Sequence, residues 1–281
     1  MKEKQVILSS YYGGLGDNLA YSTLPEEFFK QKRIKVSFSK FANFRNKEIY
    51  DLIWKRNPYV FFKVKKKNTI NIGASAHFLK KYNVIQNYEK IHGLDVRNKY
   101  PKIYYTPKKK KLNKTFLVDI SAISLSYSKV EQDQITQKIV QIKHKYKNYK
   151  FINVIFKKKL TNEKELNFFY KIRFFIKNKI ILFGSLKSDA TGNYSYLGKH
   201  FLYQQRLDDQ IEVNSIFDYC DYISSCSGFI SLHSGQSHLS SAIKNQFNKK
   251  LKSFCIVQKK WYLFNKNNGR FIFDNINYVI I

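Results

Sequence analysis

The stretch FISLHSGQSHLSSAI (residues 229–243) has the pattern of a buried strand that turns into a helix. A short apolar run is followed by a polar turn containing Gly235. Apolar residues at helical spacing come next, with Ser237 as the expected N-cap. Such a turn places free backbone N–H groups at the positive end of the helix, which suits a phosphate. Ordinary strand–helix turns also carry Ser and Gly, so the stretch alone leaves both interpretations open.

A second glycine-rich turn lies near the N-terminus. An apolar run at residues 5–8 precedes Gly13, Gly14 and Gly16, and Asp17 opens a helical stretch. The glycine spacing differs from the dinucleotide-binding fingerprint. Asp17 is therefore either a helix cap or a carboxylate at the mouth of a cleft, where it is usable as a general base. The local residues favour the cap.

Strand and helix patterns alternate along the rest of the chain. Strands are expected at residues 34–38, 60–64, 70–72, 115–120, 151–156, 179–183 and 253–257, and helices at 48–54, 82–93, 132–145, 162–176 and 216–226. An aromatic tail at 261–278 is expected to pack back on the body. This alternation predicts an α/β fold with parallel sheets covered on both faces.

Residues 98–113 form the best candidate linker. They hold two of the four prolines and the run of four lysines at 108–111, without helical periodicity. We therefore divide the chain into domains 1–107 and 108–281, two Rossmann-like domains facing a central cleft. The lysine run is either a solvated linker, which is favoured, or a contact for membrane or phosphate.

Composition limits the class of protein. The net charge of +31 attracts polyanions, although an AT-rich coding bias also enriches lysine, so the charge alone does not establish a function. Three cysteines without metal-ligand spacing indicate reduced, buried thiols. No apolar run of eighteen residues occurs, and the N-terminus lacks the pattern of a signal peptide. These features predict a cytoplasmic protein.

Two motifs, in order, carry a family resemblance. The first is GGLGDNL (13–19) with Thr23-Leu24-Pro25, and the second is HSGQSHLSSA (233–242). Together they resemble the bacterial heptosyltransferases. These are glycosyltransferase family 9 enzymes of the two-domain GT-B fold that build lipopolysaccharide core and related surface glycans. The resemblance spans most of the chain.

The resemblance implies an inverting, metal-independent sugar transfer with no cofactor. A heptose or hexose-like unit would pass from a nucleotide-diphosphate donor, held by the C-terminal domain, to a glycan or glycolipid acceptor such as lipopolysaccharide core or capsule. Asp17 matches the family's general base. With the loops that follow the strands, the expected donor site comprises Gly14, Gly16, Ser126, Lys129, Gly184, His233, Ser234, Gly235, Gln236, Ser237 and His238. Lys129 is the candidate cation for the leaving group.

Two alternatives and one departure remain at this stage. His233 stands where the family has an aspartate that contacts the donor sugar, so the motif does not specify heptose. The basic charge also fits a nucleic-acid-binding protein, but no nucleic-acid module is evident and this partner is disfavoured. A catalytically inactive GT-B scaffold is the other alternative. Peripheral contact with the anionic inner face of the plasma membrane stays open.

Overall fold

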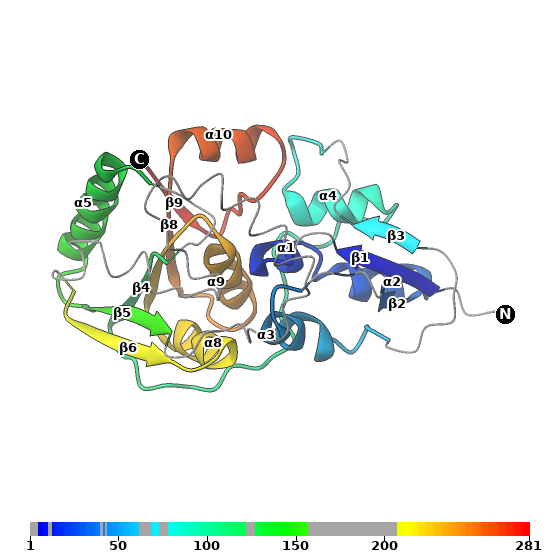
Figure 1. The fold of residues 1–281 in the computed structure, drawn as a ribbon, viewed down its shortest axis with the longest axis horizontal. Helices are drawn as coiled ribbons and strands as arrows, with labels where there is room; N and C mark the ends of the chain where they lie inside the picture. The colour runs from blue at the N-terminus through cyan, green and yellow to red at the C-terminus, as the bar shows by residue number, and fades with distance from the viewer. Residues whose placement is uncertain are drawn as a thin grey trace, which may run out of the picture.

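The computed structural model describes residues 5–10, 13–39, 42, 44–61, 69–72, 78–121, 127–156 and 207–281. It contains two sheets in which every neighbouring strand pair is parallel (Figure 1). The smaller has the order β2-β1-β3 and the larger β6-β5-β4-β7-β8-β9. The strands are β1 (Gln5–Ser10), β2 (Lys35–Phe38), β3 (Thr69–Ile72), β4 (Thr115–Asp119), β5 (Lys150–Phe156), β6 (Asp209–Val213), β7 (Gly228–Leu232), β8 (Lys252–Val257) and β9 (Asn277–Ile280). The predicted α/β class with parallel sheets is confirmed.

Helices connect the strands in the expected alternation. In the first half they are α1 (Leu15–Ala20), α2 (Leu24–Lys32), α3 (Lys47–Tyr50), a π-helical turn (Asp51–Lys55) and α4 (Val84–Ile91). In the second half they are α5 (Lys129–Lys145), α8 (Ile216–Ser225), α9 (Gly235–Gln246) and α10 (Lys259–Asn267). Val60 forms an isolated bridge with Val36. The strand expected at 179–183 and the helix expected at 162–176 lie outside the described residues. Among the described residues, no helix is long and apolar enough to span a membrane.

The start of α9 differs from the sequence expectation. Ser234, and not Ser237, is the N-cap residue. Ser237 lies in the first turn of the helix and is buried. Its Oγ accepts a hydrogen bond from the Ser234 amide at 3.3 Å and donates one to the Ser234 carbonyl at 2.8 Å. The helix therefore begins three residues earlier than predicted, because Ser237 closes the turn from inside rather than capping it.

Both faces of the larger sheet are covered by helices. Alternate strand residues such as Phe116 and Val118 form an apolar cluster with Ile135 and Ile139 of α5. Leu117, between them in β4, belongs instead to a second cluster that includes residues of α8 and α9. This alternation is the period of two expected of a strand, so α5 covers one face and the pair α8 and α9 covers the other.

The second cluster also continues into the smaller sheet. It includes Leu8 of β1, Leu19 of α1 and Trp54, together with Tyr219 of α8 and Leu239 of α9. The two sheets thus share a contiguous apolar core rather than having two separate ones. Since such burial favours association by about 25 cal/mol per Å² of apolar surface, this core holds the two halves together.

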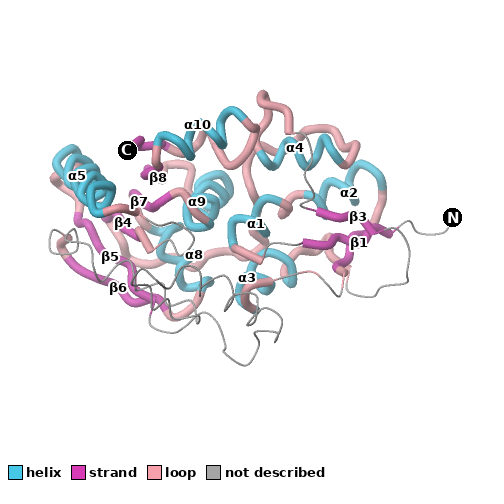
Figure 2. Tube along the Cα trace, turned by 45° about the horizontal axis from the view of Figure 1, so that its top comes forward, coloured by secondary structure: helices cyan, strands magenta, loops and turns pink. Residues whose placement is uncertain are grey.

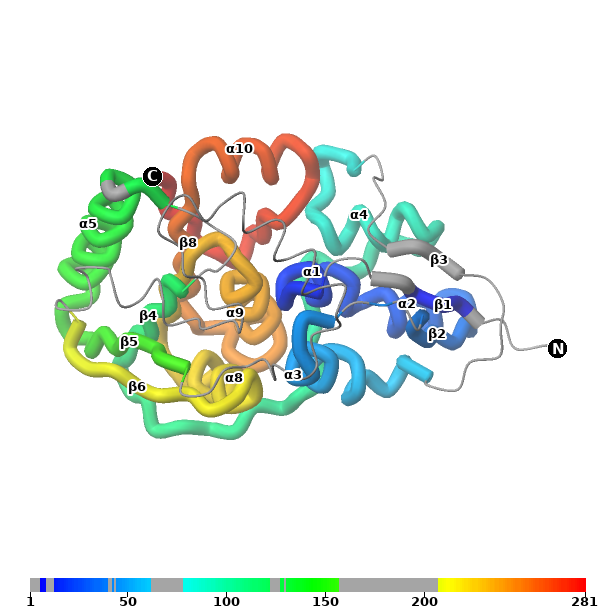
Figure 3. Tube along the Cα trace, in the orientation of Figure 1, coloured from blue at the N-terminus to red at the C-terminus, as the bar shows by residue number. Residues whose placement is uncertain are grey.

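The segment between the sheets is fixed to the body, although Lys108, Lys109 and Lys111 of its lysine run are exposed. It runs beneath α3 and α8 along the lower edge of the molecule before entering β4 (Figure 3). The side-chain amide of Gln246 in α9 makes two hydrogen bonds to the Ile103 backbone. Its Oε1 accepts from the Ile103 amide at 2.9 Å, and its Nε2 donates to the Ile103 carbonyl at 3.1 Å. Within the lysine run, Lys110 pairs with Asp218 at 2.8 Å. Because these bonds fix the segment to the body, the favoured interpretation of a solvated lysine run is wrong for Lys110.

A second connection is made by the residues that follow α10. Asn87 of α4 donates a hydrogen bond to the Gly269 carbonyl at 2.8 Å, and the Val84 amide donates to the Arg270 carbonyl at 3.0 Å. Gly269 has φ +59°, and a Cβ there would lie 2.4 Å from the Leu79 carbonyl oxygen. This position therefore requires glycine for both its backbone angle and its contacts.

We expect Gly269→Ala to destabilise the protein by about 2–5 kcal/mol, the sum of a left-handed alanine and a backbone clash. Gly93→Ala is the matched control, because Gly93 has φ +63° but a Cβ there meets only the Lys32 Nζ, at 3.3 Å. The control should lose only about 1–2 kcal/mol. Urea unfolding of the three proteins measures the difference. Equal losses would show that the contact with α4 contributes nothing.

Candidate active site

The first turns of α1 and α9 pack directly against each other (Figure 2). A Cβ on Gly16 would lie 2.6 Å from Nδ1 of His238, and one on Gly235 would lie 2.8 Å from Cβ of Leu15 and 2.9 Å from the Gly16 amide nitrogen. Distances this short leave no room for a side chain on either glycine. Glycine at both positions therefore lets the two predicted motifs meet backbone to backbone.

Buried hydrogen bonds of Asn18 also fix the start of α1. Asn18 is fully buried and donates to the Gly14 carbonyl at 2.9 Å. Its Oδ1 accepts from the indole Nε1 of Trp54 at 2.7 Å. An unpaired amide at this depth would cost about 1–3 kcal/mol, so both partners hold the glycine-rich turn in one position.

Asp17 lies in the first turn of α1, with Gly14 as the N-cap residue of the helix. Its Oδ2 is 2.7 Å from the position of a Gly14 Cβ, and Nη2 of Arg45 is 3.7 Å from the same point. Burial raises the pKa of the Asp17 carboxyl, and the charge of Arg45 and a hydrogen bond from the Gly14 amide partly oppose that rise. Asp17 is thus not an N-cap residue, although it does bind the N-terminal turn of α1.

The first turn of α9 is tied to the end of β4. Ser234 and Gly235 are partly exposed, whereas Gln236 is buried. Nε2 of Gln236 donates to the Ser121 carbonyl at 2.9 Å. The amides of Ser234 and Ser237 bond within the turn, whereas no hydrogen bond in the described chain uses the amides of Gly235 and Gln236. This turn therefore presents free N–H groups from a position fixed by its neighbours.

The buried carboxylate of Asp119 helps to fix the residues that bind the first turn of α9. Asp119 ends β4, is fully buried, and accepts hydrogen bonds from the hydroxyl of Tyr219 at 2.5 Å and the amide of Ser121 at 3.0 Å. Burial raises the pKa of Asp119 and that of Tyr219. Asp119 positions Ser121, which accepts a hydrogen bond from Gln236, and the Gln236 side chain also interacts with the Asp119 carboxyl directly and lowers its pKa.

His233 and His238, from the turn between β7 and α9, both contact Phe271. Nε2 of His233 lies 3.0 Å from the Phe271 carbonyl. His238 is 5% exposed and stacks on the Phe271 ring, with centroids 4.6 Å apart. The Gly16 backbone lies close enough to the His238 ring to raise its pKa, as an accepting carbonyl does, but neither ring nitrogen makes a hydrogen bond of good geometry in the described chain. Burial lowers the pKa of both imidazoles, and the neighbouring His233 lowers that of His238 further.

The structure brings most of the predicted site residues to one place. Gly14, Gly16 and Asp17 come from the start of α1, and the run 233–238 comes from the turn between β7 and α9. Within this group, the His238 ring packs on the ring of Phe271. Lys129 is the first residue of α5, and its side chain is not described. Ser126 and Gly184 lie outside the described residues.

Four residues of the site were missed by sequence reasoning: Arg45, Asp119, Tyr219 and Phe271. Each reaches the site through a contact between segments far apart in the chain. Asp119 is read as the polar end of an apolar run, and Phe271 as part of an aromatic tail. A charged residue directly after a buried strand was the one signal that could have identified Asp119.

Comparison with solved structures places this geometry in a known fold. E. coli heptosyltransferase WaaC with ADP matches with a TM-score of 0.54 and 8% identity, covering 99% of this chain and 93% of WaaC. A glycosyl transferase family 9 protein from Veillonella parvula DSM 2008 matches with a TM-score of 0.52 and 8% identity. The alignment covers 100% of this chain and 86% of that protein. The chain has the heptosyltransferase fold. No protein-family model and no curated protein matches the sequence.

TibC from enterotoxigenic E. coli H10407, an iron-containing dodecameric glycosyltransferase, is a third match, with a TM-score of 0.53 and 14% identity. The alignment covers 98% of this chain but 63% of TibC, so this chain spans less than two thirds of that protein. The described residues hold no group of three or more His, Cys, Asp or Glu side chains placed to bind a metal ion. We therefore assign no metal site to them.

We expect Gly16→Ala to destabilise the protein by about 1–3 kcal/mol, because its Cβ overlaps the His238 ring. His238→Ala removes that ring, so the double variant should be more stable than the sum of the two single losses predicts. A double-mutant cycle by chemical unfolding measures this interaction energy. Strict additivity would show that Gly16 and His238 do not pack together in solution.

Proposed function

We propose that this chain is a glycosyltransferase that moves a sugar from a nucleotide-diphosphate donor to a glycan acceptor. The observation that carries the proposal is the packing of α1, the helix that contains Asp17, against the first turn of α9 in a heptosyltransferase fold. A half-buried carboxylate on one helix start and free backbone amides on the other supply a base and an anion site.

The donor site is proposed at the start of α9. The amides of Gly235 and Gln236 and the hydroxyl of Ser234 would hold the diphosphate on the helix N-terminus. Lys129, at the start of α5, would supply a cation. Ser126 and Gly184, which lie outside the described residues, are kept as donor-site candidates on the sequence alone. In this proposal the helix end and Lys129 stabilise the leaving group without a metal.

The reaction proposed is a single displacement. Asp17 takes the proton from the acceptor hydroxyl as its oxygen attacks the anomeric carbon. The bond between that carbon and the phosphate oxygen breaks, and the nucleoside diphosphate leaves with the bonding electron pair. The amides at the start of α9 stabilise the negative charge that develops on the phosphate. Attack from the face opposite the leaving group inverts the anomeric centre.

The partners are proposed from the similar structures. WaaC is described with ADP and TibC in complex with ADP-D-β-D-heptose, so ADP-sugars are the first donors to test. The acceptor proposed is a bacterial surface glycan, such as lipopolysaccharide core or capsule, and nucleic acid is not an expected partner. The acceptor would contact domain 1–107 and the donor domain 108–281. We place the enzyme in the cytoplasm, where its basic surface would meet the inner face of the membrane.

We expect Asp17→Asn to lower kcat by about 10²–10⁴-fold while leaving ADP binding unchanged, because the amide cannot accept the acceptor's proton. Asp95→Asn is the control, since it makes the same chemical change at an exposed carboxylate. Turnover of ADP-sugars and calorimetric titration with ADP provide the two readouts. Full activity in the Asp17 variant would exclude it as the base. Absence of ADP binding in all three proteins would contradict the donor site.

We expect the acidic limb of kcat/KM to lie above the ordinary aspartate pKa of 3.8, because burial raises the pKa of Asp17. The base must be ionised, so activity is lost as the pH falls through that raised pKa. Arg45→Gln removes a positive charge that lowers the pKa of Asp17. The limb should therefore move to higher pH in this variant. A limb that stays in place or moves down would show that Asp17 does not control it.

A further inference from the structure

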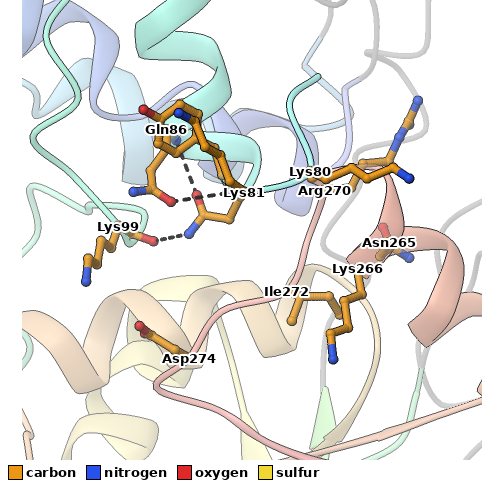
Figure 4. Close-up of a pocket in the computed structure, with 12 residues that line it drawn as sticks. Lys80, Lys81, Gln86, Lys99, Asn265, Lys266, Arg270, Ile272 and Asp274 are labelled. Atoms are coloured by element: carbon orange, nitrogen blue, oxygen red, sulfur yellow. Dashed lines mark hydrogen bonds between the residues drawn. The ribbon is translucent and has the colours of Figure 1, made fainter. Parts of the chain in front are cut away.

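A pocket of about 340 Å³ lies at the junction of the two halves, and none of its lining residues belongs to α9 (Figure 4). One wall comes from the residues that lead into and follow α4, including Lys80, Lys81 and Lys99. The other comes from the end of α10 and the segment after it, including Lys266 and Arg270. Figure 4 shows the labelled side chains reaching the pocket from both walls.

The charge of this pocket is strongly one-sided. Its lining contains five cationic residues and a single carboxylate, Asp274, which already accepts a hydrogen bond from the hydroxyl of Tyr100. In the described part of the chain, none of the five forms an ion pair. Five like charges around one small cavity repel each other, so an anion bound there would be favoured.

The walls are held in place without a ligand. Nδ2 of Asn83 donates to the Lys99 carbonyl at 2.7 Å, and Asn87 ties the opposite wall through the Gly269 carbonyl at 2.8 Å. The Arg270 guanidinium lies over the rings of Phe78 and Phe264, at 5.8 and 5.3 Å from their centroids. Small-molecule sites are commonly preformed in this way.

The lining also carries uncharged hydrogen-bonding groups. No hydrogen bond in the described chain uses Nε2 of Gln86 or the hydroxyl of Tyr82, and both residues line the pocket. A ligand that matches this set has several acceptor oxygens with negative charge and also neutral hydroxyls. The volume lies near the lower end of the range of about 300–1,000 Å³ for small-molecule sites, which favours a monosaccharide-sized ligand over a polymer.

We infer that this junction pocket binds a phosphorylated saccharide. The phosphate is held by lysines from both walls, and the sugar hydroxyls by Gln86 and Tyr82. The site is distinct from the proposed donor site and does not depend on the transferase proposal. The two are neighbours, however, because Phe271 packs on His238 while Arg270 and Ile272 on either side of it line the pocket.

The test is calorimetric titration of the full chain with glucose 6-phosphate, glucose and inorganic phosphate. Lys99→Glu/Lys266→Glu should weaken glucose 6-phosphate binding at least tenfold, and Lys99→Gln/Lys266→Gln should give an intermediate loss. The control Lys249→Glu/Lys250→Glu makes the same change in net charge at exposed lysines outside the pocket, and should change binding less than twofold. Glucose should not bind. ADP binding should stay within twofold in all variants, and thermal unfolding confirms that each is folded.

Several results would overturn the inference. Equal weakening by the pocket and control variants would indicate general attraction to a basic protein. If inorganic phosphate bound as tightly as glucose 6-phosphate, the sugar would contribute nothing to binding, and the pocket would be a phosphate site rather than a saccharide site. Loss of ADP binding in the pocket variants alone would show that the pocket belongs to the donor site. Tight binding of a single-stranded oligonucleotide, lost only in the pocket variants, would replace the sugar phosphate with nucleic acid.

Discussion

The close approach of α1 to α9 is the constraint on which the rest of this molecule depends. Gly16 and Gly235 allow two helix starts from different sheets to meet without side chains between them. Hydrogen bonds then fix the first turn of each helix, that of α1 through Asn18 and that of α9 through Gln236. The apolar core also continues from one sheet to the other, so packing across both halves helps to keep the two motifs in their relative positions.

The electrostatics of the site come mainly from burial and backbone dipoles. Its carboxylate and imidazoles are removed from water, which raises the pKa of Asp17 and lowers that of His238. Both shifts favour the uncharged form, and the backbone amides at the start of α9 add positive potential that does not depend on the protonation of a side chain. An anion bound there would replace solvent with dipoles that are already oriented, which is the arrangement that favours charge development during a reaction.

The sequence predicted those parts of the fold that have a strong local pattern. The buried strands β4, β7 and β8 are apolar runs, and they were found. The edge strand β6 is mostly exposed along its length, and α10 exposes Trp261 and other large apolar residues, so neither has the pattern of a half-buried element. At the site, the two glycine motifs were visible locally. Arg45, Asp119 and Phe271 were not, because their roles follow from contacts across the chain that no spacing rule encodes.

The net charge of +31 could not be interpreted from composition because its meaning depends on placement. Lys30 and Lys102 both pair with Glu26, and Lys110 pairs with Asp218, so some of the 51 basic side chains have partners within the fold. At the junction pocket the cations converge instead from two walls. The segment that forms one of those walls also places Phe271 against His238. A short stretch after α10 therefore joins the two sheets, supports the candidate active site and concentrates positive charge, which links the basic composition to a defined position in the structure.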